Sequence, residues 1–493
     1  MLAPDQFQVV FSEVTIRELN MPRNETVKAS AGCCRHTRLS FEPTAQAVVA
    51  NYQRPALKKR AAATTSSGRE PHTIDVEASD SSTFPAPLIL PGDDLALDPK
   101  YPAQSVRAWI REKERNKVTH ERTIYVAAPP DVDPEVGTIN SWSQPAINIM
   151  DCPMPIASPD VNDVGQYLSA FYYGMPVKLL PPSTLRFISW NEGASSTSKR
   201  RRRQANPKST AETEDLQFIG LTTSAEIVRI GTRQTPSAPF QRQLNLNDLL
   251  DVAIAVLPDD AYALLLLVEH DLFEDENDDF CCGRAYGGSS VAVVSMARYH
   301  PGLDTEQSVE RHHSWPASHC EKYLNSCCSA PEKRQCLHTN PKKKRAKTDI
   351  AADCLLEETQ STVPAAISPL QAAVSAHNGI PSCDSSSKVS TEVLEGLWLG
   401  RVCKTASHEL GHCFGIDHCV YYACIMQGTA SVAEDARQPP YLCPVDEAKL
   451  ESAIGGGKHE RVAKLIEFCD KKENENTHLF KAFAAWLRAR TKA

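Results

Sequence analysis

The chain carries the stretch HELGHCFGIDH at residues 408–418, which decides both its fold and its chemistry. Residues 391–407 before it place apolar side chains at mixed steps of three and four, a spacing that predicts an α-helix running into the stretch. Residues four apart on a helix lie on one face, one turn above the other. His408 and His412 should therefore point the same way and share one metal ion, with Glu409 beside the metal rather than on it.

A glycine and a third histidine extend the motif. Gly415 can adopt the left-handed backbone that ends a helix, and the resulting turn brings His418 back to the same metal. Three imidazole ligands and one open position are typical of a catalytic zinc site rather than a closed structural one. A carboxylate at Glu409 can take a proton from zinc-bound water. The alternative, a helix whose histidines only cap or fill a core, does not account for the glutamate and the glycine turn together.

Composition and charge exclude several broad classes of protein. The 493 residues are 41% hydrophobic and 23% charged, so a sizeable core is compatible with long polar segments. The formal net charge of -8 gives no general attraction to nucleic acid. The 17 cysteines are far below the density of a small disulfide scaffold. The composition therefore predicts a globular protein with polar insertions.

We expect an intracellular protein, cytoplasmic, nuclear or both, with no membrane partner. The first residues, 1–6, read MLAPDQ and lack a basic region followed by an apolar one, so no secretory signal is expected. The longest apolar run, residues 261–268, is too short to span a membrane. Thiols should then be reduced, a setting in which clustered cysteines favour metal binding over disulfides.

Apolar periodicity predicts alternating helices and strands, which is typical of an α/β domain. Helices are expected at residues 104–113, 161–173 and 244–257, and from the pattern over residues 391–407 into the motif as far as Gly415, with one or two more between 459 and 490. Strands are expected at residues 123–127, 176–180, 262–269 and 290–296. Asn245 or Asn247 is a suitable cap for the third helix.

Polar segments precede and interrupt this pattern. We expect residues 1–82 to form a mostly disordered N-terminal extension. Residues 83–300 should form the N-terminal part of the catalytic domain, with a basic insertion at 191–214. Residues 301–390 are polar and low in periodicity, which predicts a low-complexity insertion. Residues 391–493 should complete the domain with the motif helix and the C-terminal helices.

The chain continues as HCVYYACIM over residues 418–426, and here it resembles the archaemetzincin family of the metzincins. In that family the third His is followed by Cys, four residues, Cys, one residue and Met. The resemblance implies that Met426 packs beneath the metal site. It extends over roughly residues 83–190, 216–299 and 391–450, with matching stretches at 84–87, 167–171, 177–181 and 257–261.

The resemblance also implies a second, structural zinc site. Its ligands would be Cys419, Cys424, Cys443 and Asp446. Asp446 stands where the family has a cysteine, and three thiolates with one carboxylate can still bind zinc tetrahedrally. Completion of the site by Cys403, Cys413 or a water is an alternative to Asp446, and buried thiols without metal are another.

The fold that the resemblance implies is α/β (α+β): a metzincin-like catalytic domain with a mixed sheet, an active-site helix and a small C-terminal part, interrupted by disordered insertions. The implied activity is that of a zinc metallopeptidase, which hydrolyses peptide bonds through a zinc-bound water activated by Glu409. The cofactors would be one catalytic and one structural zinc, and the partner a peptide or protein substrate, with short peptides cleaved from the amino end as one class. The candidates for a second oxyanion donor, each also explained by packing, are Tyr299, Tyr421 and Tyr422.

Other functions remain open from the sequence. A non-catalytic zinc-binding interaction protein would not need Glu409, whereas another metal-dependent hydrolase, such as an amidase, would share the motif. Two basic runs, residues 199–203 and 341–345, resemble signals bound by the nuclear-import machinery, and a nuclear regulatory role is a further alternative. These runs lack the aromatic residues of a nucleic-acid site.

The long insertion also holds a group of side chains whose spacing fits no zinc module, so we expect free thiols there. The group comprises Cys320, Cys327, Cys328, Cys336 and His338.

Overall fold

A computed structural model describes residues 34–71, 80–119, 123–147, 155–190, 217–236, 238–286, 288, 290–329, 367–380, 390–471, 473–474 and 477–492. Within these ranges, no helix is both long and apolar enough to cross a membrane. Four features singled out in the sequence lie outside the described residues: the basic runs at 199–203 and 341–345, Cys336 and His338.

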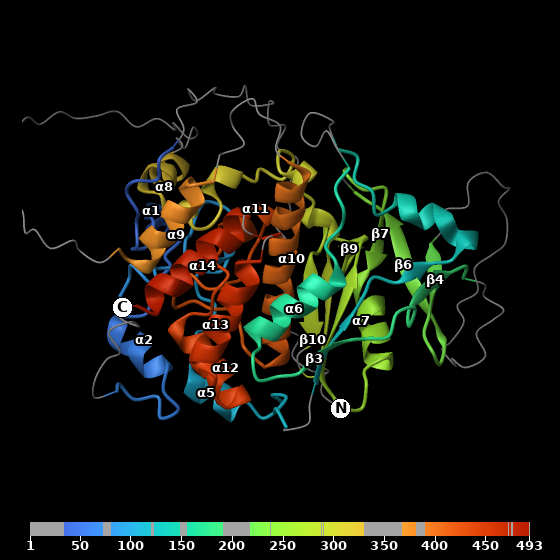
Figure 1. Ribbon diagram of the computed structural model, residues 1–493, viewed down its shortest axis with the longest axis horizontal. Coiled ribbons are helices and arrows are strands. Elements are labelled where there is room, and N and C mark those ends of the chain that lie inside the picture. Colours follow the sequence, from blue (N-terminus) through green and yellow to red (C-terminus); the bar gives the residue numbers. More distant parts are fainter. Residues whose placement is uncertain are drawn as a thin grey trace, which may run out of the picture.

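A five-stranded mixed sheet carries the strands that were expected from the sequence (Figure 1). Its order is β10 (Gly283–Tyr286), β11 (Val291–Ser295), β8 (Ala261–Val268), β1 (Thr123–Ala127) and β3 (Val177–Leu179). β10 is antiparallel to β11, and the other neighbours are parallel. Every residue of β8 is buried, because the strand lies in the middle of a sheet covered on both faces. The prediction of a mixed sheet in an α/β fold is confirmed.

Helices cover both faces of this sheet. α10 (Thr391–Cys413) and α6 (Val161–Phe171) pack on one face, and α7 (Leu246–Ala255) packs on the other. The side chains of β8 alternate accordingly, so that Leu265 belongs to the larger core under α10 and Leu264 belongs to the smaller core under α7. The continuous apolar run of β8 thus feeds two hydrophobic cores at once.

A second sheet of six strands was not expected. Its order is β2 (Asp131–Val132), β4 (Arg186–Ile188), β5 (Phe218–Thr222), β6 (Ile227–Gln234), β7 (Arg242–Asn245) and β9 (Asp271–Phe273). α7 contacts both β6 and β11 and so packs between the two sheets (Figure 1). The strands of this sheet escaped prediction because several are very short, and the longest, β6, is largely half-exposed with only Ile230 fully buried.

Four helices follow the motif helix toward the C-terminus. They are α11 (Val432–Arg437), α12 (Pro444–Ile454), α13 (Lys458–Cys469) and α14 (His478–Arg490). α13 packs on α6, and α14 packs on α13. One or two helices were expected between residues 459 and 490, and the structure has two, α13 and α14, which are separated by residues 470–477.

Part of the N-terminal extension is folded, which corrects the expectation of a mostly disordered segment for residues 34–71. Among the described residues, the helices before the first strand are α1 (Ala45–Val49), α2 (Leu57–Ala63), α4 (Asp94–Leu97) and α5 (Val106–Arg111), and η1 (Pro134–Ser141) follows β2. Tyr52 is buried, and its hydroxyl donates a hydrogen bond to the carbonyl of Val420 at 2.6 Å. α5 lies within the helix expected at residues 104–113, whereas α1 and α2 are too short to show a helical periodicity in the sequence.

Parts of the insertion predicted over residues 301–390 are also folded, which corrects that expectation for residues 301–329 and 367–380. The elements there are η4 (Pro301–Leu303), η5 (Arg311–His313), η6 (Ala317–His319), α8 (Glu321–Cys328) and α9 (Pro369–Asn378), preceded by η3 (Ala297–Tyr299). Trp315 is 1% exposed and belongs to the main core, and α9 packs along α14. α9 begins with a capping box between Ser368 and Gln371, a local signal that the sequence analysis did not use.

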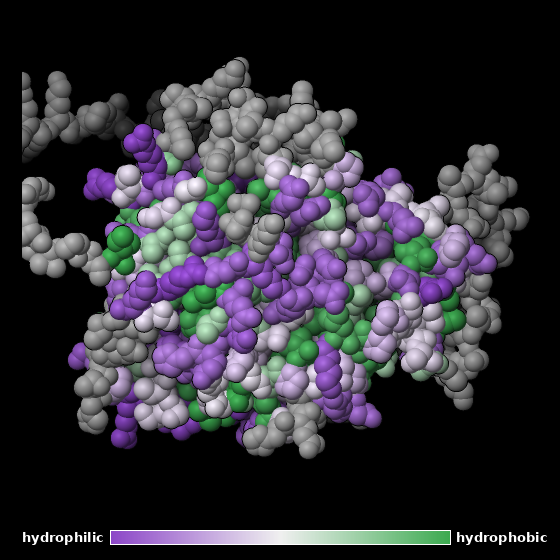
Figure 2. All heavy atoms as spheres, in the orientation of Figure 1, coloured by the Kyte–Doolittle hydropathy of each residue, from purple (hydrophilic) through white to green (hydrophobic). Residues whose placement is uncertain are grey.

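The outer surface is mixed in character. On the face drawn in Figure 2, hydrophobic residues lie in small groups separated by hydrophilic ones. The large apolar side chains are instead gathered in the cores on the two faces of the five-stranded sheet.

Candidate metal centres

α10 positions three residues of the motif inside the protein. His408, Glu409 and His412 are all buried, with Glu409 only 1% exposed. The helix reaches so deep because its apolar side packs on the sheet and because small residues allow close approach. A Cβ atom at Gly411 would lie 2.5 Å from the Sδ atom of Met426, so Met426 packs directly on the helix beside His412.

The fold brings the three motif histidines together. The ring centroids of His408 and His412 are 4.7 Å apart, and that of His418 lies 5.4 Å and 5.0 Å from them. One nitrogen from each ring falls within 4.8 Å of the other two. The Nε2 atoms of His408 and His412 are 3.0 Å apart. This geometry is that of three ligands facing one point.

Hydrogen bonds fix the direction in which these imidazoles point. The Nδ1 atom of His408 lies 2.6 Å from the carbonyl of Ile425, and that of His412 lies 2.7 Å from the carbonyl of Ile416. A carbonyl only accepts, so each Nδ1 carries the proton and each Nε2 presents a lone pair to the centre. The Nε2 atom of His418 is buried without a hydrogen-bond partner among the described residues. The donor set therefore suits a divalent cation such as zinc.

The turn after α10 depends on two glycines. Gly415 has a φ of +73°, the left-handed conformation expected from the sequence, and a Cβ atom there would lie 2.7 Å from the Cγ atom of Arg115. A Cβ atom at Gly428 would lie 2.8 Å from the Nδ1 atom of His418. A side chain at either position would disturb the chain that returns His418 to the other two histidines.

Glu409 is buried beside His408 and faces the same region. Burial raises the pKa of Glu409 to about 8, and the positive charge of Arg284 opposes this shift. Its Oε2 atom is buried and has no hydrogen-bond partner among the described residues. A Cβ atom at Gly283 would come within 3.3 Å of its Cγ atom, so the glycine in β10 leaves room for this side chain.

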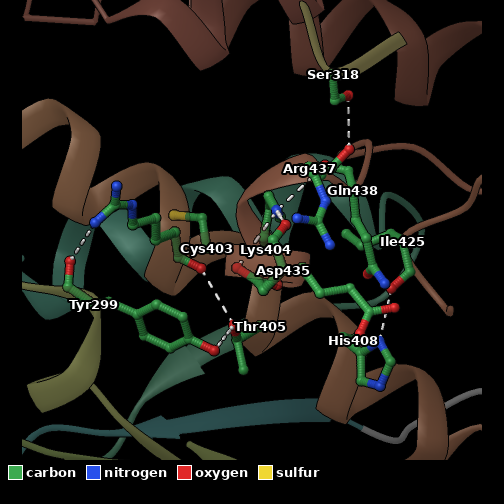
Figure 3. Close-up of polar contacts among 12 residues, drawn as sticks. Tyr299, Ser318, Cys403, Lys404, Thr405, His408, Ile425, Asp435, Arg437 and Gln438 are labelled. Atoms are coloured by element: carbon green, nitrogen blue, oxygen red, sulfur yellow. Dashed lines mark hydrogen bonds and ion pairs between the residues drawn. The ribbon is translucent and has the colours of Figure 1, made fainter. Parts of the chain in front are cut away.

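A cavity beside His408 and Glu409 has a polar wall, which Figure 3 shows in part. The Nζ atom of Lys404 lies 3.5 Å from a carboxylate oxygen of Asp435. The Oγ1 atom of Thr405 lies 2.7 Å from the hydroxyl of Tyr299. These groups give the cavity wall donors and acceptors next to His408 and Glu409.

The three tyrosines considered as oxyanion donors lie in different places. Tyr299 lines the cavity, whereas Tyr421 and Tyr422 are absent from its lining. The ring of Tyr422 instead packs edge-on against Phe84, with the Arg60 guanidinium 5.2 Å from its centroid. Tyr299 is therefore the candidate with access to the cavity.

The fold also brings together the four residues named for a second metal. Their ligand atoms lie within 4.8 Å of one another, and all four residues are buried. The Sγ atoms of Cys419 and Cys443 are 3.6 Å apart, and the Oδ2 atom of Asp446 lies 3.3 Å from the Sγ atoms of both Cys424 and Cys443. None of the described cysteines forms a disulfide.

Asp446 occupies the fourth corner of this group, and neither Cys403 nor Cys413 belongs to it. Lys449 donates a hydrogen bond of 2.8 Å to Oδ1 of Asp446, which leaves Oδ2 facing the thiols. Burial and the nearby Cys419 raise the pKa of Asp446 to about 7, while Lys449 opposes the shift. A cation among these groups would relieve the repulsion between adjacent thiolates and carboxylate.

Sequence reasoning missed the polar groups of the cavity wall. Lys404 and Thr405 line the cavity from α10, one helical turn before His408 and Glu409, and both are buried. A stripe of polar side chains on a helix whose remaining faces are apolar marks a functional surface, and it was readable in the sequence. Asp435 and Gln438 come from a distant segment, so no local pattern connects them to the motif.

The comparison with known families matches the C-terminal part of the chain. The model of peptidase family M54 matches residues 387–452. Archaemetzincin-2 of Mus musculus is 38% identical over 111 residues, which are 19% of this chain and 31% of that protein. Archaemetzincin-1 of Homo sapiens is 28% identical over 255 residues, which are 50% of this chain and 39% of that protein. The matches thus span well under half the length of these curated relatives.

Among solved structures, the crystal structure of archaemetzincin from Methanopyrus kandleri is 15% identical to this chain. The superposition covers 69% of this chain and 98% of that chain, with a TM-score of 0.29.

Proposed function

We propose that this chain is a zinc-dependent metallopeptidase that hydrolyses peptide bonds and that it belongs to the archaemetzincin family, peptidase family M54, whose model matches residues 387–452. One observation carries the proposal: three buried imidazoles converge on one point with Glu409 beside them. Packing in a hydrophobic core does not explain this group. A buried imidazole costs free energy of folding unless its polar nitrogens have a hydrogen-bond partner or a metal.

We propose His408, His412 and His418 as the ligands of a catalytic zinc ion. Two observations support this ligand set. The Nε2 atom of His418 has no hydrogen-bond partner among the described residues. The Nε2 atoms of His408 and His412 face each other, and since both are acceptors, they cannot form a hydrogen bond with each other. A zinc ion bound there would polarise a peptide carbonyl and lower the pKa of a water molecule toward neutrality. The Nδ1 hydrogen bonds to Ile425 and Ile416 hold two of the imidazoles in the required tautomer.

Glu409 is the proposed general base. Its Oε2 atom has no protein partner among the described residues, so it is available to accept a proton from a water molecule in the cavity. Its raised pKa also suits the next step, because a carboxyl group that holds a proton near neutral pH can pass it to the leaving amine. The positive charge of Arg284 opposes this rise in the pKa of Glu409.

The cavity wall supports a peptide as the substrate. Thr405, Tyr299 and Gln427 offer donors and acceptors of the kind that bind a peptide backbone. Short peptides cleaved from the amino end are the substrate class that we would test first, with Tyr299 as the candidate donor to the developing oxyanion.

We propose a structural role for the second group. Cys419, Cys424, Cys443 and Asp446 would fill all four positions around a zinc ion, which leaves none for a substrate. Removing one thiol should release this metal while leaving the histidine site intact. Elemental analysis should therefore find one zinc fewer in the Cys424→Ala variant and one fewer in His412→Ala, each relative to wild type.

The test of the catalytic proposal is the Glu409→Gln variant on a library of short peptides. We expect it to keep its zinc and to lose about 10²–10⁴-fold in kcat, the usual contribution of a positioned acid–base group. The matched control is Glu392→Gln, an exposed glutamate at the start of the same helix, which should cleave at the wild-type rate. Wild-type turnover in Glu409→Gln would refute the assigned base. A wild type that binds zinc but cleaves no peptide would favour the non-catalytic, partner-binding alternative.

Nuclear entry is a separate proposal that rests on the sequence alone. The runs at residues 199–203 and 341–345 are basic enough to bind import machinery. Deleting both runs from a fluorescent fusion should move the protein out of the nucleus, and an unchanged distribution would remove the idea.

A further inference from the structure

A third group of metal-ligating side chains lies away from the two centres described above. It joins the N-terminal segment to η5, which are far apart in the sequence. Ligand atoms of Cys34, His36 and His313 lie within 4.8 Å of one another. No sequence pattern connects these residues, because their spacing follows no known zinc module.

His36 is oriented with one nitrogen toward this group. Its Nδ1 atom lies 2.8 Å from Oδ1 of Asn378, and the Nδ2 atom of that amide donates a hydrogen bond of 3.0 Å to the carbonyl of Arg35. The second bond fixes the amide, so Oδ1 must accept from Nδ1–H of His36. The Nε2 atom therefore carries a lone pair. His36 is only 6% exposed, and this Nε2 atom is buried without a hydrogen-bond partner among the described residues.

His313 is held in the same way. Its Nδ1 atom lies 2.7 Å from a carboxylate oxygen of Glu310, and its ring stacks on Tyr323 with centroids 4.0 Å apart. Its Nε2 atom is also buried without a hydrogen-bond partner in the described part of the chain. A carboxylate behind the distal nitrogen of a histidine is the arrangement that orients zinc-binding imidazoles.

Packing alone does not account for two such nitrogens beside a thiol. The Cys34 thiol carries one hydrogen, so it can satisfy at most one of the two Nε2 atoms. A cation satisfies both imidazoles and the sulfur together. His408 and His412 show the same design, with Nδ1 anchored and Nε2 facing inward.

We propose that Cys34, His36 and His313 bind a zinc ion, and that Cys320, whose Sγ atom lies outside the group of atoms within 4.8 Å of one another, moves closer to become the fourth ligand. The Sγ atoms of Cys34 and Cys320 are 3.5 Å apart. Two thiolates on one tetrahedral zinc lie about 3.7 Å apart, given Zn–S bonds of about 2.3 Å. Binding displaces the proton of each thiol and changes no oxidation state. With all four positions filled by protein, the site is structural.

Such a site would fasten three parts of the chain that the sequence predicts to be loosely attached. Its ligands come from residues 34–36 of the N-terminal extension and from residues 313–320 of the insertion, and Asn378 adds the end of α9. The same regions are the ones whose folding the sequence analysis did not anticipate. Because the apolar contacts of these segments are small, metal binding would contribute free energy that stabilises their folded form.

The test is zinc content per chain by elemental analysis on the purified full-length protein after dialysis. Cys34→Ala and His313→Ala should each contain one zinc fewer than wild type. The matched control is Cys327→Ala, a half-buried thiol on α8 outside the group, which should keep the wild-type content. Cys34→His should contain as much zinc as wild type, unlike Cys34→Ala, because an imidazole can replace the thiolate as a ligand. Unchanged zinc content in both ligand variants would overturn the proposal.

A second measurement uses the wild-type chain and so does not depend on whether the variants fold. Alkylation of individual cysteines, followed by mass spectrometry, should be slowed by zinc at Cys34 and Cys320 relative to Cys327, and the protection should be lost with a chelator. Equal rates with and without zinc, or a disulfide between Cys34 and Cys320 in the isolated protein, would refute a zinc site here. The His412→Ala background separates this result from the catalytic proposal, because the protection at Cys34 should persist there.

Discussion

Replacing Asp304 by asparagine should destabilise the protein by removing the centre of a buried charge cluster. The two carboxylate oxygens of Asp304 accept from both terminal nitrogens of Arg401, at 2.7 Å and 2.9 Å. The Nε atom of Arg311 donates to the same carboxylate at 2.6 Å. Arg401 belongs to the motif helix and Arg311 to η5, so this carboxylate connects α10 to the folded part of the insertion.

The expected magnitude follows from burial. The side chains of Asp304 and Arg401 are 7% and 4% exposed, so the pair is protected from solvent. Breaking a buried pair typically costs about 3–5 kcal/mol, because the remaining charge has lost its partner. Arg311 is 25% exposed and stays partly hydrated, so we place the loss for Asp304→Asn near the lower end, at about 3 kcal/mol.

Urea unfolding followed by tryptophan fluorescence provides the assay, with an exposed ion pair as the control. Asp131 and Arg186 are 3.8 Å apart, and their side chains are about half exposed, so Asp131→Asn should cost less than about 1 kcal/mol. Adding Arg401→Gln to Asp304→Asn should cost less than the sum of the two single changes, because the pair is coupled. The reasoning is wrong if Asp304→Asn and Asp131→Asn shift the midpoint equally, or if the two changes in the cluster are additive.

Two further predictions concern packing and pH. Gly411→Ala should displace Met426, whose Sδ atom would lie 2.5 Å from the new Cβ, and should lower the unfolding free energy by about 1–3 kcal/mol; a thermal midpoint equal to that of wild type would contradict the contact. Burial lowers the pKa of His270 to about 4, with its hydrogen bond to Ile139 opposing the shift. The folded state therefore favours the neutral ring. This preference contributes up to about 3 kcal/mol to the free energy of unfolding, and the contribution is complete above pH 6.5 and lost as the pH falls toward 4. His270→Asn should flatten this part of the stability profile, and an unchanged profile would show that other groups control it.

Local patterns were enough to predict the parts of the fold that position the histidines. β8 and β11 are apolar runs, and α6, α7 and α10 carry apolar stripes, so these patterns can be read from a single sequence, whereas β10 (GRAY) has no such pattern and was not predicted. The cap at Asn245, whose side chain accepts from the amide of Asp248, was one of the two positions expected. The convergence of His408 and His418 followed from helix geometry and one glycine, without any knowledge of tertiary structure.

Features that depend on distant contacts could not be predicted in this way. The six-stranded sheet is built from short, half-exposed strands whose identity comes from pairing, as in the parallel contact of β2 with β4. The cavity wall joins Tyr299 to Thr405 across the fold, and no spacing rule connects them. Cys34 and Cys320 were assigned to a disordered extension and to free thiols, because their proximity exists only once both segments have folded onto the core.

The adjacency of His418 and Cys419 has a thermodynamic consequence. These neighbours belong to the histidine group and the cysteine group respectively, so one peptide bond connects the two centres. The amide of Cys419 is held by the carbonyl of Met426 at 2.7 Å, which limits how far the backbone can move at either centre. Metal binding at the two centres should therefore be thermodynamically linked. The factor by which an ion at the cysteines changes the metal affinity of the histidines must equal the factor by which an ion at the histidines changes the metal affinity of the cysteines.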